Sequence, residues 1–156
     1  MTYFTEWDAP SGIFKAGSIK RASSSNDKVW GEVNKSDEDL LAGTFVKVNP
    51  AGGIIPLAAA TDRVHGIIVR GVFGDKIPKS ETADVGHFSH GDEVIALAVT
   101  GQAFARGDKV NIVASGANKG KITKVVAGTI ATDYYATEVS GDLVAITLGF
   151  AQTVGA

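Results

Sequence analysis

Short apolar runs rich in β-branched residues alternate with polar, glycine-containing turns along most of the chain. These runs predict strands at 44–48, 53–57, 64–73, 92–99, 109–114, 121–127 and 143–150. The stretches 50–53 and 115–120 lie between predicted strands and have the small, polar content that is typical of turns. Seven short strands with frequent turns indicate an all-β fold, arranged as a small β-barrel or a barrel-like sandwich.

One phrase, Gly-Asp-x-Val, occurs three times, beginning at Gly91, Gly107 and Gly141. Glycine provides the positive φ of a tight turn, aspartate caps the turn through its own side chain, and valine begins a half-buried run. Each copy therefore predicts a turn that leads into a strand.

A single segment, 36–43, has the signals of a short helix. Ser36 can act as the N-terminal cap, acidic residues follow in the first turn, and Gly43 can end the helix. We therefore expect at most one short helix in an otherwise all-β chain.

Residues 1–35 differ from the rest because they contain a polar break and no sustained periodicity. We predict an extended N-terminal arm at 1–35 and a single β-barrel-like domain at 36–156. The first 30 residues also hold five of the twelve aromatic residues, namely Tyr3, Phe4, Trp7, Phe14 and Trp30. Large rings can cover the core of their own domain or bind a neighbouring molecule, and the sequence leaves both interpretations open.

The charge pattern removes nucleic acid from the expected direct partners. Charged residues make up 21% of the chain and its formal net charge is −2, without the basic clusters that phosphate binding requires.

Cysteine is absent, which excludes disulfides and thiolate chemistry. The first residues lack the pattern of a secretory signal and no apolar run has the length of a transmembrane helix. We therefore expect no membrane partner and synthesis in the cytoplasm.

The sequence offers no recognisable catalytic or cofactor motif. His87 and His90 lie near two aspartates, but their spacing fits no metal motif, and we interpret them as loop histidines. The segment 115–121 ends in Gly-Lys but lacks the opening glycine, the final Ser or Thr and the helix of a phosphate loop. We therefore predict neither an enzyme nor a bound cofactor or metal. A pair of acids that meet only in space would not be visible in the sequence.

Two adjacent tyrosines, Tyr134 and Tyr135, occur in a Thr-rich stretch that we predict to be a connection before the last strand. Paired tyrosines can form a protein interface or a platform for a carbohydrate. The simpler interpretation, which we favour, has one ring packed inward and the other on the surface.

Three phrases follow one another along the predicted domain. Residues 42–48 read Ala-Gly-x-x-Val-x-Val, a valine-rich run ends at Val99 and Gly101, and residues 107–110 read Gly-Asp-Lys-Val. Together with the sequence GDEVIALAVTGQAFARGDKVNIV at 91–113, this pattern resembles the small head decoration proteins of tailed bacteriophages, also called capsid cement proteins. As a pattern of strands and glycines, the resemblance covers roughly residues 40–150.

The resemblance implies a virion structural protein that decorates the outer surface of an expanded phage capsid. Such a protein stabilises the capsid by bridging subunits of the major capsid protein, often as a homotrimer, and catalyses no reaction. It would be made in the host bacterial cytoplasm, and the five arm aromatics named above would bind the partner. The alternative is a glycan- or ligand-binding β domain of a phage tail or host-surface protein, with the tyrosine pair at its site.

Overall fold

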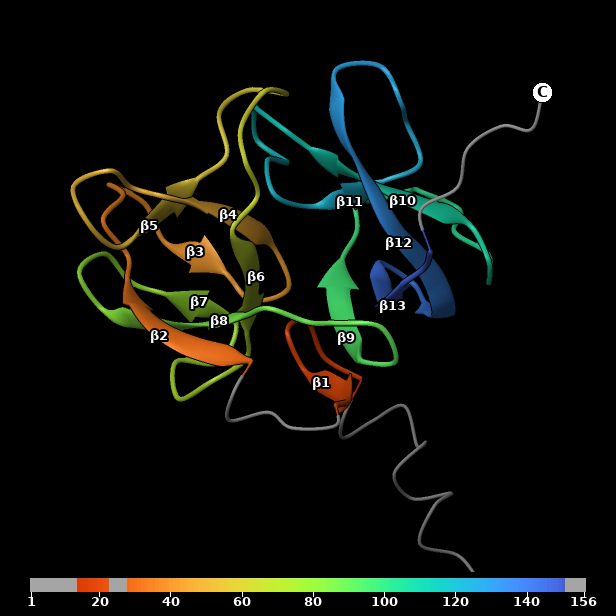
Figure 1. The fold of residues 1–156 in the computed structure, drawn as a ribbon, viewed down its shortest axis with the longest axis horizontal. Helices are drawn as coiled ribbons and strands as arrows, with labels where there is room; N and C mark the ends of the chain where they lie inside the picture. Colours follow the sequence, from red (N-terminus) through yellow and green to blue (C-terminus); the bar gives the residue numbers. More distant parts are fainter. Residues whose placement is uncertain (1–13, 23–27, 151–156) are drawn as a thin grey trace, which may run out of the picture.

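The computed structural model of the chain describes residues 14–22 and 28–150, which form two antiparallel sheets and one small ribbon (Figure 1). The six-stranded sheet has the order β1 (Ile19–Arg21), β9 (Glu93–Leu97), β13 (Leu143–Leu148), β12 (Thr129–Ser140), β10 (Lys109–Val113) and β11 (Ile122–Thr123). The five-stranded sheet has the order β2 (Val29–Val33), β8 (Thr82–Gly86), β6 (Gly66–Val69), β4 (Phe45–Val48) and β5 (Ile54–Pro56). The ribbon pairs β3 (Leu40–Leu41) with β7 (Lys76–Ile77).

The all-β prediction is confirmed for the described residues, which contain strands and no helix. Single parallel bridges, Asn34 with Ile54 and Ala98 with Ile122, link outer parts of each sheet without a full strand pair, so the fold is a barrel-like sandwich and not a closed barrel. The main apolar core is made by side chains from both sheets, among them Phe45, Val94 and Ile146. A second buried cluster joins the five-stranded sheet to the β3–β7 ribbon. Strand β6 is therefore buried along its whole length, which explains its continuous apolar sequence.

The three Gly-Asp-x-Val phrases form the predicted turns before β9, β10 and β13. Their glycines have φ values of 91°, 92° and 61° in chain order, in the region that favours glycine. Asp92 accepts a hydrogen bond from the Ser89 N–H at 3.0 Å, and Asp108 accepts one from the Ala105 N–H at 2.8 Å. The third aspartate instead accepts a hydrogen bond from the hydroxyl of Thr100. The turn-then-strand prediction is confirmed at all three sites.

The predicted helix at 36–43 is wrong, because a buried asparagine organises this segment as a turn. Asn34 donates from Nδ2 to the carbonyl oxygens of Glu38, at 2.9 Å, and Ile77, at 3.1 Å. Its Oδ1 accepts a hydrogen bond from the N–H of Ser36, at 3.0 Å, so the expected helix cap is bound within a turn. The leucines that follow form β3 and pair with β7. Tertiary packing thus overrides a weak local preference for helix.

Strand β12 is the largest departure from the sequence-based prediction. Its 12 residues were expected to form a connection, yet they pair with β10 on one side and β13 on the other. Most of its residues are half-buried or exposed, and only Ala136 is fully buried, so the strand lacks the apolar run that marked the others. Its threonines and tyrosines favour strands all the same, because they suit a half-buried pleated surface.

Two stretches of the predicted arm are strands of the sandwich. Strand β1 pairs with β9 at one edge of the six-stranded sheet, and β2 pairs with β8 at one edge of the five-stranded sheet. Residues 1–13 and 23–27 lie outside the described part of the chain. The division into an arm and a domain stays a prediction.

A pair of glycines joins the two sheets through main-chain hydrogen bonds, and we name it the glycine seam. The Gly17 N–H donates to the Ile95 carbonyl, and the Gly17 carbonyl accepts from the Arg70 N–H, both at 2.8 Å. Gly43 makes an equivalent pair of bonds to residues of β6 and β9. Both glycines have positive φ, 77° and 81°, so the seam depends on backbone that other residues rarely adopt.

Candidate functional site

The structure describes only two of the five aromatic residues predicted to bind a partner. Tyr3, Phe4 and Trp7 lie outside the described residues. Phe14 is half-buried near the start of the described chain. Trp30 lies on β2 with 51% of its surface exposed, which is unusual for so large an apolar ring.

The Trp30 ring rests on a small cluster at the edge of the five-stranded sheet. Its centroid lies 3.9 Å from that of His87 and 5.7 Å from that of His65. His65 Nε2 lies 2.6 Å from a carboxylate oxygen of Glu32, which also belongs to β2. We call Trp30, Glu32, His65 and His87 the Trp30 cluster. It holds one face of the indole in place and leaves the rest of the ring available for contact.

The histidines do not gather with other ligands into a metal site. Among residues 14–22 and 28–150, no group of three or more His, Cys, Asp and Glu side chains has the geometry to hold a metal ion. Burial lowers the pKa of His87, and the nearby His65 lowers it further. His87 is therefore neutral at neutral pH and acts as a packing and hydrogen-bonding group. In the same described residues, no helix is long and apolar enough to span a bilayer.

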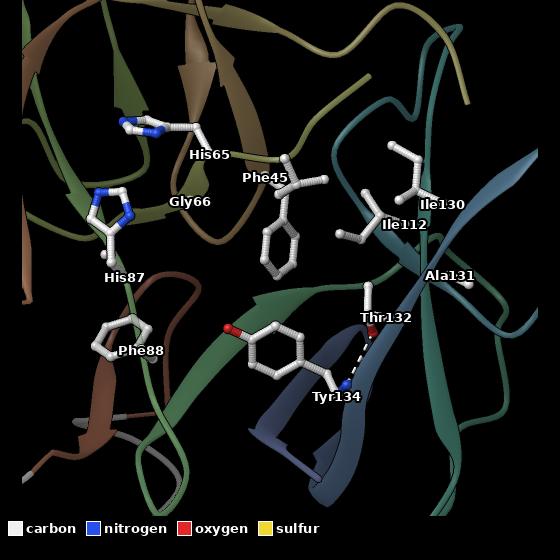
Figure 2. A pocket seen from close by; sticks show the side chains of 12 residues that line it. Phe45, His65, Gly66, His87, Phe88, Ile112, Ile130, Ala131, Thr132 and Tyr134 are labelled. Carbon is white, nitrogen blue, oxygen red and sulfur yellow. Dashed lines mark hydrogen bonds between the residues drawn. The ribbon is translucent and has the colours of Figure 1, made fainter. Parts of the chain in front are cut away.

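A cavity of about 400 Å³ lies between the two sheets beside the Trp30 cluster (Figure 2). We call it the intersheet cavity. Its walls come from both sheets, and its main side chains are Phe45, Val64, His87, Phe88, Ile112, Ile130 and Tyr134. No pattern in the sequence indicates this cavity, because these residues come from five separate segments and meet only when the sheets pack.

The two adjacent tyrosines point to opposite faces of β12, as consecutive strand residues do. Tyr134 packs inward, with its ring centroid 5.8 Å from that of Phe45, whereas Tyr135 is 40% exposed. The simpler interpretation of the pair is confirmed. The predicted connection around them is wrong, and the two rings do not form a common platform for a glycan.

Raising the pH is expected to destabilise the protein through Tyr134. Burial raises the pKa of Tyr134 to about 12, with the charge of Asp92 as a second cause, from an ordinary value of 10.0. Between pH 10.0 and about 12, the tyrosine of the unfolded chain loses its phenolic proton while Tyr134 of the folded protein keeps it. The contribution of this group to the free energy of unfolding is therefore complete below the ordinary pKa and is lost as the pH rises towards the raised pKa. The loss is about 2 to 3 kcal/mol in all. Urea unfolding across this pH range measures it. A Tyr134→Phe variant should lack this part of the loss of stability. If the free energy of unfolding falls equally with pH in both proteins, the loss does not come from Tyr134.

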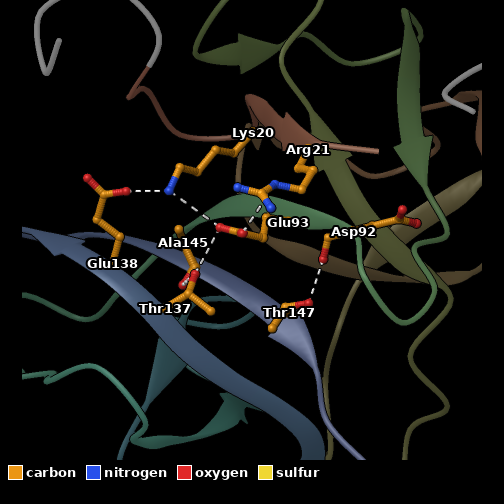
Figure 3. Close-up of polar contacts among 8 residues, drawn as sticks. All are labelled: Lys20, Arg21, Asp92, Glu93, Thr137, Glu138, Ala145 and Thr147. Atoms are coloured by element: carbon orange, nitrogen blue, oxygen red, sulfur yellow. Dashed lines mark hydrogen bonds and ion pairs between the residues drawn. The ribbon is translucent and has the colours of Figure 1, made fainter. Parts of the chain in front are cut away.

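Charged side chains on the six-stranded sheet neutralise one another and attach β1 (Figure 3). Lys20 forms ion pairs with Glu138 and, at 3.5 Å, with Glu93, and Arg21 lies 3.6 Å from Glu93. The Thr137 hydroxyl donates a further hydrogen bond to Glu93 at 3.0 Å. Because these charges are mutually balanced, this part of the sheet presents no field of one sign to a partner.

A buried ion pair joins the start of β2 to the turn before β9, and so joins the two sheets. Lys28 Nζ lies 2.5 Å from a carboxylate oxygen of Asp92, whose side chain is only 1% exposed. The main-chain carbonyl of Asp92 accepts a hydrogen bond from the Thr147 hydroxyl at 2.7 Å (Figure 3). We call this the Lys28–Asp92 pair. It fixes the strand that carries Trp30.

Two exposed apolar turns were not predicted from the sequence, because the predicted strands 64–73 and 121–127 covered them. Strand β6 ends at Val69, earlier than predicted, and Val72 in the following turn is 94% exposed. Strand β11 ends at Thr123, and Val126 is 75% exposed in the next loop. The signal for the first turn was a pair of bulky residues between two glycines, at 71–74. The first turn follows a strand of the five-stranded sheet, and the second follows a strand of the six-stranded sheet. We therefore treat them as two separate exposed apolar sites.

Comparison with known proteins gives a family match and a similar solved structure. The sequence profile of a family described as XM1 gp53 minor capsid protein matches residues 4–148. A chain in a solved structure of the capsid of Myoviridae phage XM1 is 26% identical, and the similarity covers 85% of this chain and 88% of that chain. The two structures superpose with a TM-score of 0.67. No curated protein sequence matches.

Proposed function

Because this chain belongs to the XM1 gp53 minor capsid protein family, it is a structural protein of a phage virion, and we propose that it acts as a decoration protein. In this role it binds the outer surface of an expanded head and bridges subunits of the major capsid protein. The family match over 4–148 is the observation that carries the proposal. The sequence resemblance described above adds the cementing role, and we propose no catalytic activity.

Stabilisation of the head in this proposal follows from mass action. A protein that binds the assembled lattice, and not its alternatives, stabilises each site by RT ln(1 + [L]/Kd). At a thousandfold excess over Kd, this is about 4 kcal/mol per site. The same stabilisation is gained at every occupied site on the head. A small protein that binds each site with modest affinity can therefore stabilise the whole head.

We propose that the docking surface is the β2 edge with Trp30, together with Tyr3, Phe4, Trp7 and Phe14. Exposed tryptophan that is packed on one face is typical of interface hot spots, because it offers a large contact area with little loss of entropy. Trp30 meets this description, since its ring is 51% exposed and lies 3.9 Å from His87. The Lys28–Asp92 pair holds the same strand rigid.

Co-sedimentation with expanded heads that lack the protein tests the cementing role. The full chain is expected to pellet with heads at a saturable ratio. A variant without residues 1–13, which keeps every described strand, is expected to pellet less at equal concentration because three of the proposed anchors are gone. If the full chain does not pellet, the decoration proposal is wrong. If both proteins pellet equally, the proposed role of the N-terminal aromatics is wrong.

Replacing Trp30 with alanine is expected to weaken binding to heads by about thirtyfold, the effect of a typical hot-spot residue. Tyr135→Ala is a matched control, because that ring is 40% exposed but lies on the other sheet. The control should bind heads like the parent. Binding isotherms from sedimentation measure both, and circular dichroism confirms that each variant is folded. Equal losses for the two variants would remove the β2 edge from the docking surface.

The proposed homotrimer is tested by sedimentation equilibrium of the purified protein. The expected mass is three times the chain mass of 16.1 kDa. A trimer binds a lattice with avidity, since the second and third contacts are intramolecular once the first has formed. A mass of one chain at all accessible concentrations would contradict the trimer in solution.

A further inference from the structure

An ordered turn between β6 and β7 presents two large apolar side chains to solvent. A main-chain hydrogen bond closes this turn, with the Gly74 N–H donating to the Gly71 carbonyl at 3.0 Å. Val72 and Phe73 lie at its centre and are 94% and 41% exposed. We call residues 71–74 the Val72 turn.

Main-chain hydrogen bonds also fix both ends of the Val72 turn. On the side of β6, the Arg70 N–H donates to the Gly17 carbonyl at 2.8 Å. On the side of β7, the Asp75 carbonyl accepts a hydrogen bond from the Ala42 N–H at 2.9 Å. The side chains of Arg70 and Asp75 form an ion pair with each other. Because the turn is held in one geometry before any contact forms, binding through Val72 and Phe73 loses little conformational entropy.

A pocket of about 440 Å³ opens beside the same turn, with Arg70 and Asp75 in its wall. Its apolar lining includes three half-buried leucines, namely Leu41 of β3, Leu97 of β9 and Leu143 of β13. Leu97 and Leu143 lie directly opposite each other in the six-stranded sheet. We call this space the leucine pocket.

The glycine seam explains why the leucine pocket is open. A Cβ atom on Gly17 would lie 3.0 Å from the Cβ of Ala42, and a Cβ atom on Gly43 would lie 3.0 Å from the Cβ of Ala16. Both alanines line the pocket. The close approach of the main chains at the seam thus places glycine and alanine where longer side chains would cover the leucines. The pocket is therefore fixed by backbone packing and not left by a mobile side chain.

The charges beside the turn and the pocket are of opposite sign. Asp84 is exposed and its carboxylate lies against the turn, since a Cβ atom on Gly71 would be 2.6 Å from its Oδ2. Lys15 is exposed and lies at the rim of the leucine pocket. Neither side chain forms an ion pair within 14–22 and 28–150, whereas Arg70 and Asp75 neutralise each other. The turn therefore carries an uncompensated negative charge and the pocket an uncompensated positive one.

We propose that the leucine pocket of one copy of this chain binds the Val72 turn of a second copy, with Lys15 facing Asp84 of the partner subunit. The contact joins an apolar projection to an apolar pocket, and both are present on every chain. A contact between two different surfaces repeats head to tail and closes into a ring when its rotation allows. The inference rests on the homotrimer proposed above and assigns the surfaces that join its subunits.

Charged substitutions at the turn and in the pocket test the contact. Val72→Asp and Leu143→Arg are each expected to weaken self-association about thirtyfold, because each places a charge in an apolar contact. Sedimentation equilibrium measures this as a fall from the trimer mass towards the chain mass of 16.1 kDa. Circular dichroism confirms that each variant is folded.

Val126→Asp is the matched control for the turn. It makes the same change at a valine that is 75% exposed in the other apolar turn, so this variant should remain a trimer. If Val72→Asp assembles like the parent, or if Val126→Asp loses assembly to the same extent, the Val72 turn is not the contact and the proposal is wrong.

Exchanging the two charges tests which surfaces meet. Lys15→Glu and Asp84→Lys are each expected to weaken self-association about tenfold, because each places like charges opposite one another. A variant with both changes should recover the association of the parent, since opposite charges meet again with their signs reversed. If the double variant is weaker than either single variant, these two residues do not face each other and the proposed geometry is overturned.

Removal of residues 1–13 tests the other possible occupant, because this segment leads directly to the rim of the leucine pocket. The shortened chain is expected to form the trimer like the parent. Loss of the trimer would assign the pocket to residues 1–13 and overturn the proposal.

Co-sedimentation with heads separates this inference from the decoration role. If the parent is a single chain at all accessible concentrations but pellets with heads, the subunit contact is wrong and the decoration proposal stands. If the parent is a trimer that responds to the substitutions as expected but does not pellet, the contact stands and the decoration proposal is wrong.

Discussion

A Lys28→Met variant is expected to lose about 3 kcal/mol of its free energy of unfolding, as is typical when one partner of a buried ion pair is removed. Methionine keeps the length and the apolar stem of lysine but not its charge. The Asp92 carboxylate, with a side chain only 1% exposed, then lacks the ammonium that now lies at 2.5 Å. Urea unfolding measures the loss as a lower midpoint with an unchanged slope.

A second lysine provides the matched control for this experiment. Lys79 forms an ion pair with Asp37, and their side chains are 59% and 95% exposed. Lys79→Met is therefore expected to keep an unfolding midpoint close to that of the parent, because exposed ion pairs contribute little to stability. If the two variants lose the same stability, burial of the Lys28–Asp92 pair does not matter and its proposed role in holding β2 is wrong.

A Gly17→Ala variant is expected to lose about 2 to 4 kcal/mol of its free energy of unfolding, because the glycine seam has no room for a side chain. The added Cβ would lie 2.7 Å from the Arg70 nitrogen and 2.8 Å from the Ile68 carbonyl oxygen, and both are backbone atoms that cannot move aside alone. A positive φ of 77° adds strain for any residue with a Cβ. Thermal unfolding followed by circular dichroism measures the change.

Gly116→Ala separates the two causes of this loss. Gly116 has a similar φ, 83°, but an added Cβ there would meet no atom within 4 Å. The Gly116→Ala variant is therefore expected to lose only the part of the free energy of unfolding that comes from backbone strain at positive φ, about 1 to 2 kcal/mol. Equal losses at Gly17 and Gly116 would mean that close packing at the seam adds nothing, contrary to the expectation.

Elements defined by local chemistry could be predicted from the sequence, and those defined by distant contacts could not. The Gly-Asp-x-Val turns depend on glycine conformation at all three sites and, at Asp92 and Asp108, on a carboxylate that binds an N–H three residues away, so each turn was visible in a few letters. The turn at 36–39 depends on Asn34, whose bonds reach as far as Ile77. Strand β12 is held by neighbours on both sides, and its own pattern of half-buried threonines resembles that of a connection.

The candidate site shows the same limit. Trp30 could be chosen from the sequence because five of the twelve aromatic residues lie in the first 30 residues, and its assignment to the docking surface stays a proposal. The intersheet cavity could not be predicted, since Phe45 and Tyr134 are far apart in the chain and meet only across two packed sheets. The prediction that one tyrosine packs inward and the other is exposed is confirmed, although it was made for a connection, and the alternation of β12 is what separates the two rings.

The pairing of β1 with β9 also orders events during translation. Residues 19–21 leave the ribosome about 70 residues before their partners at 93–97, and the glycine seam needs residues from the same late segment. The first strand therefore waits in the nascent chain until the middle of the protein has been made. A chain that stops before β9 has no place for β1, so ribosome-bound fragments should become resistant to protease around β1 only once β9 has emerged.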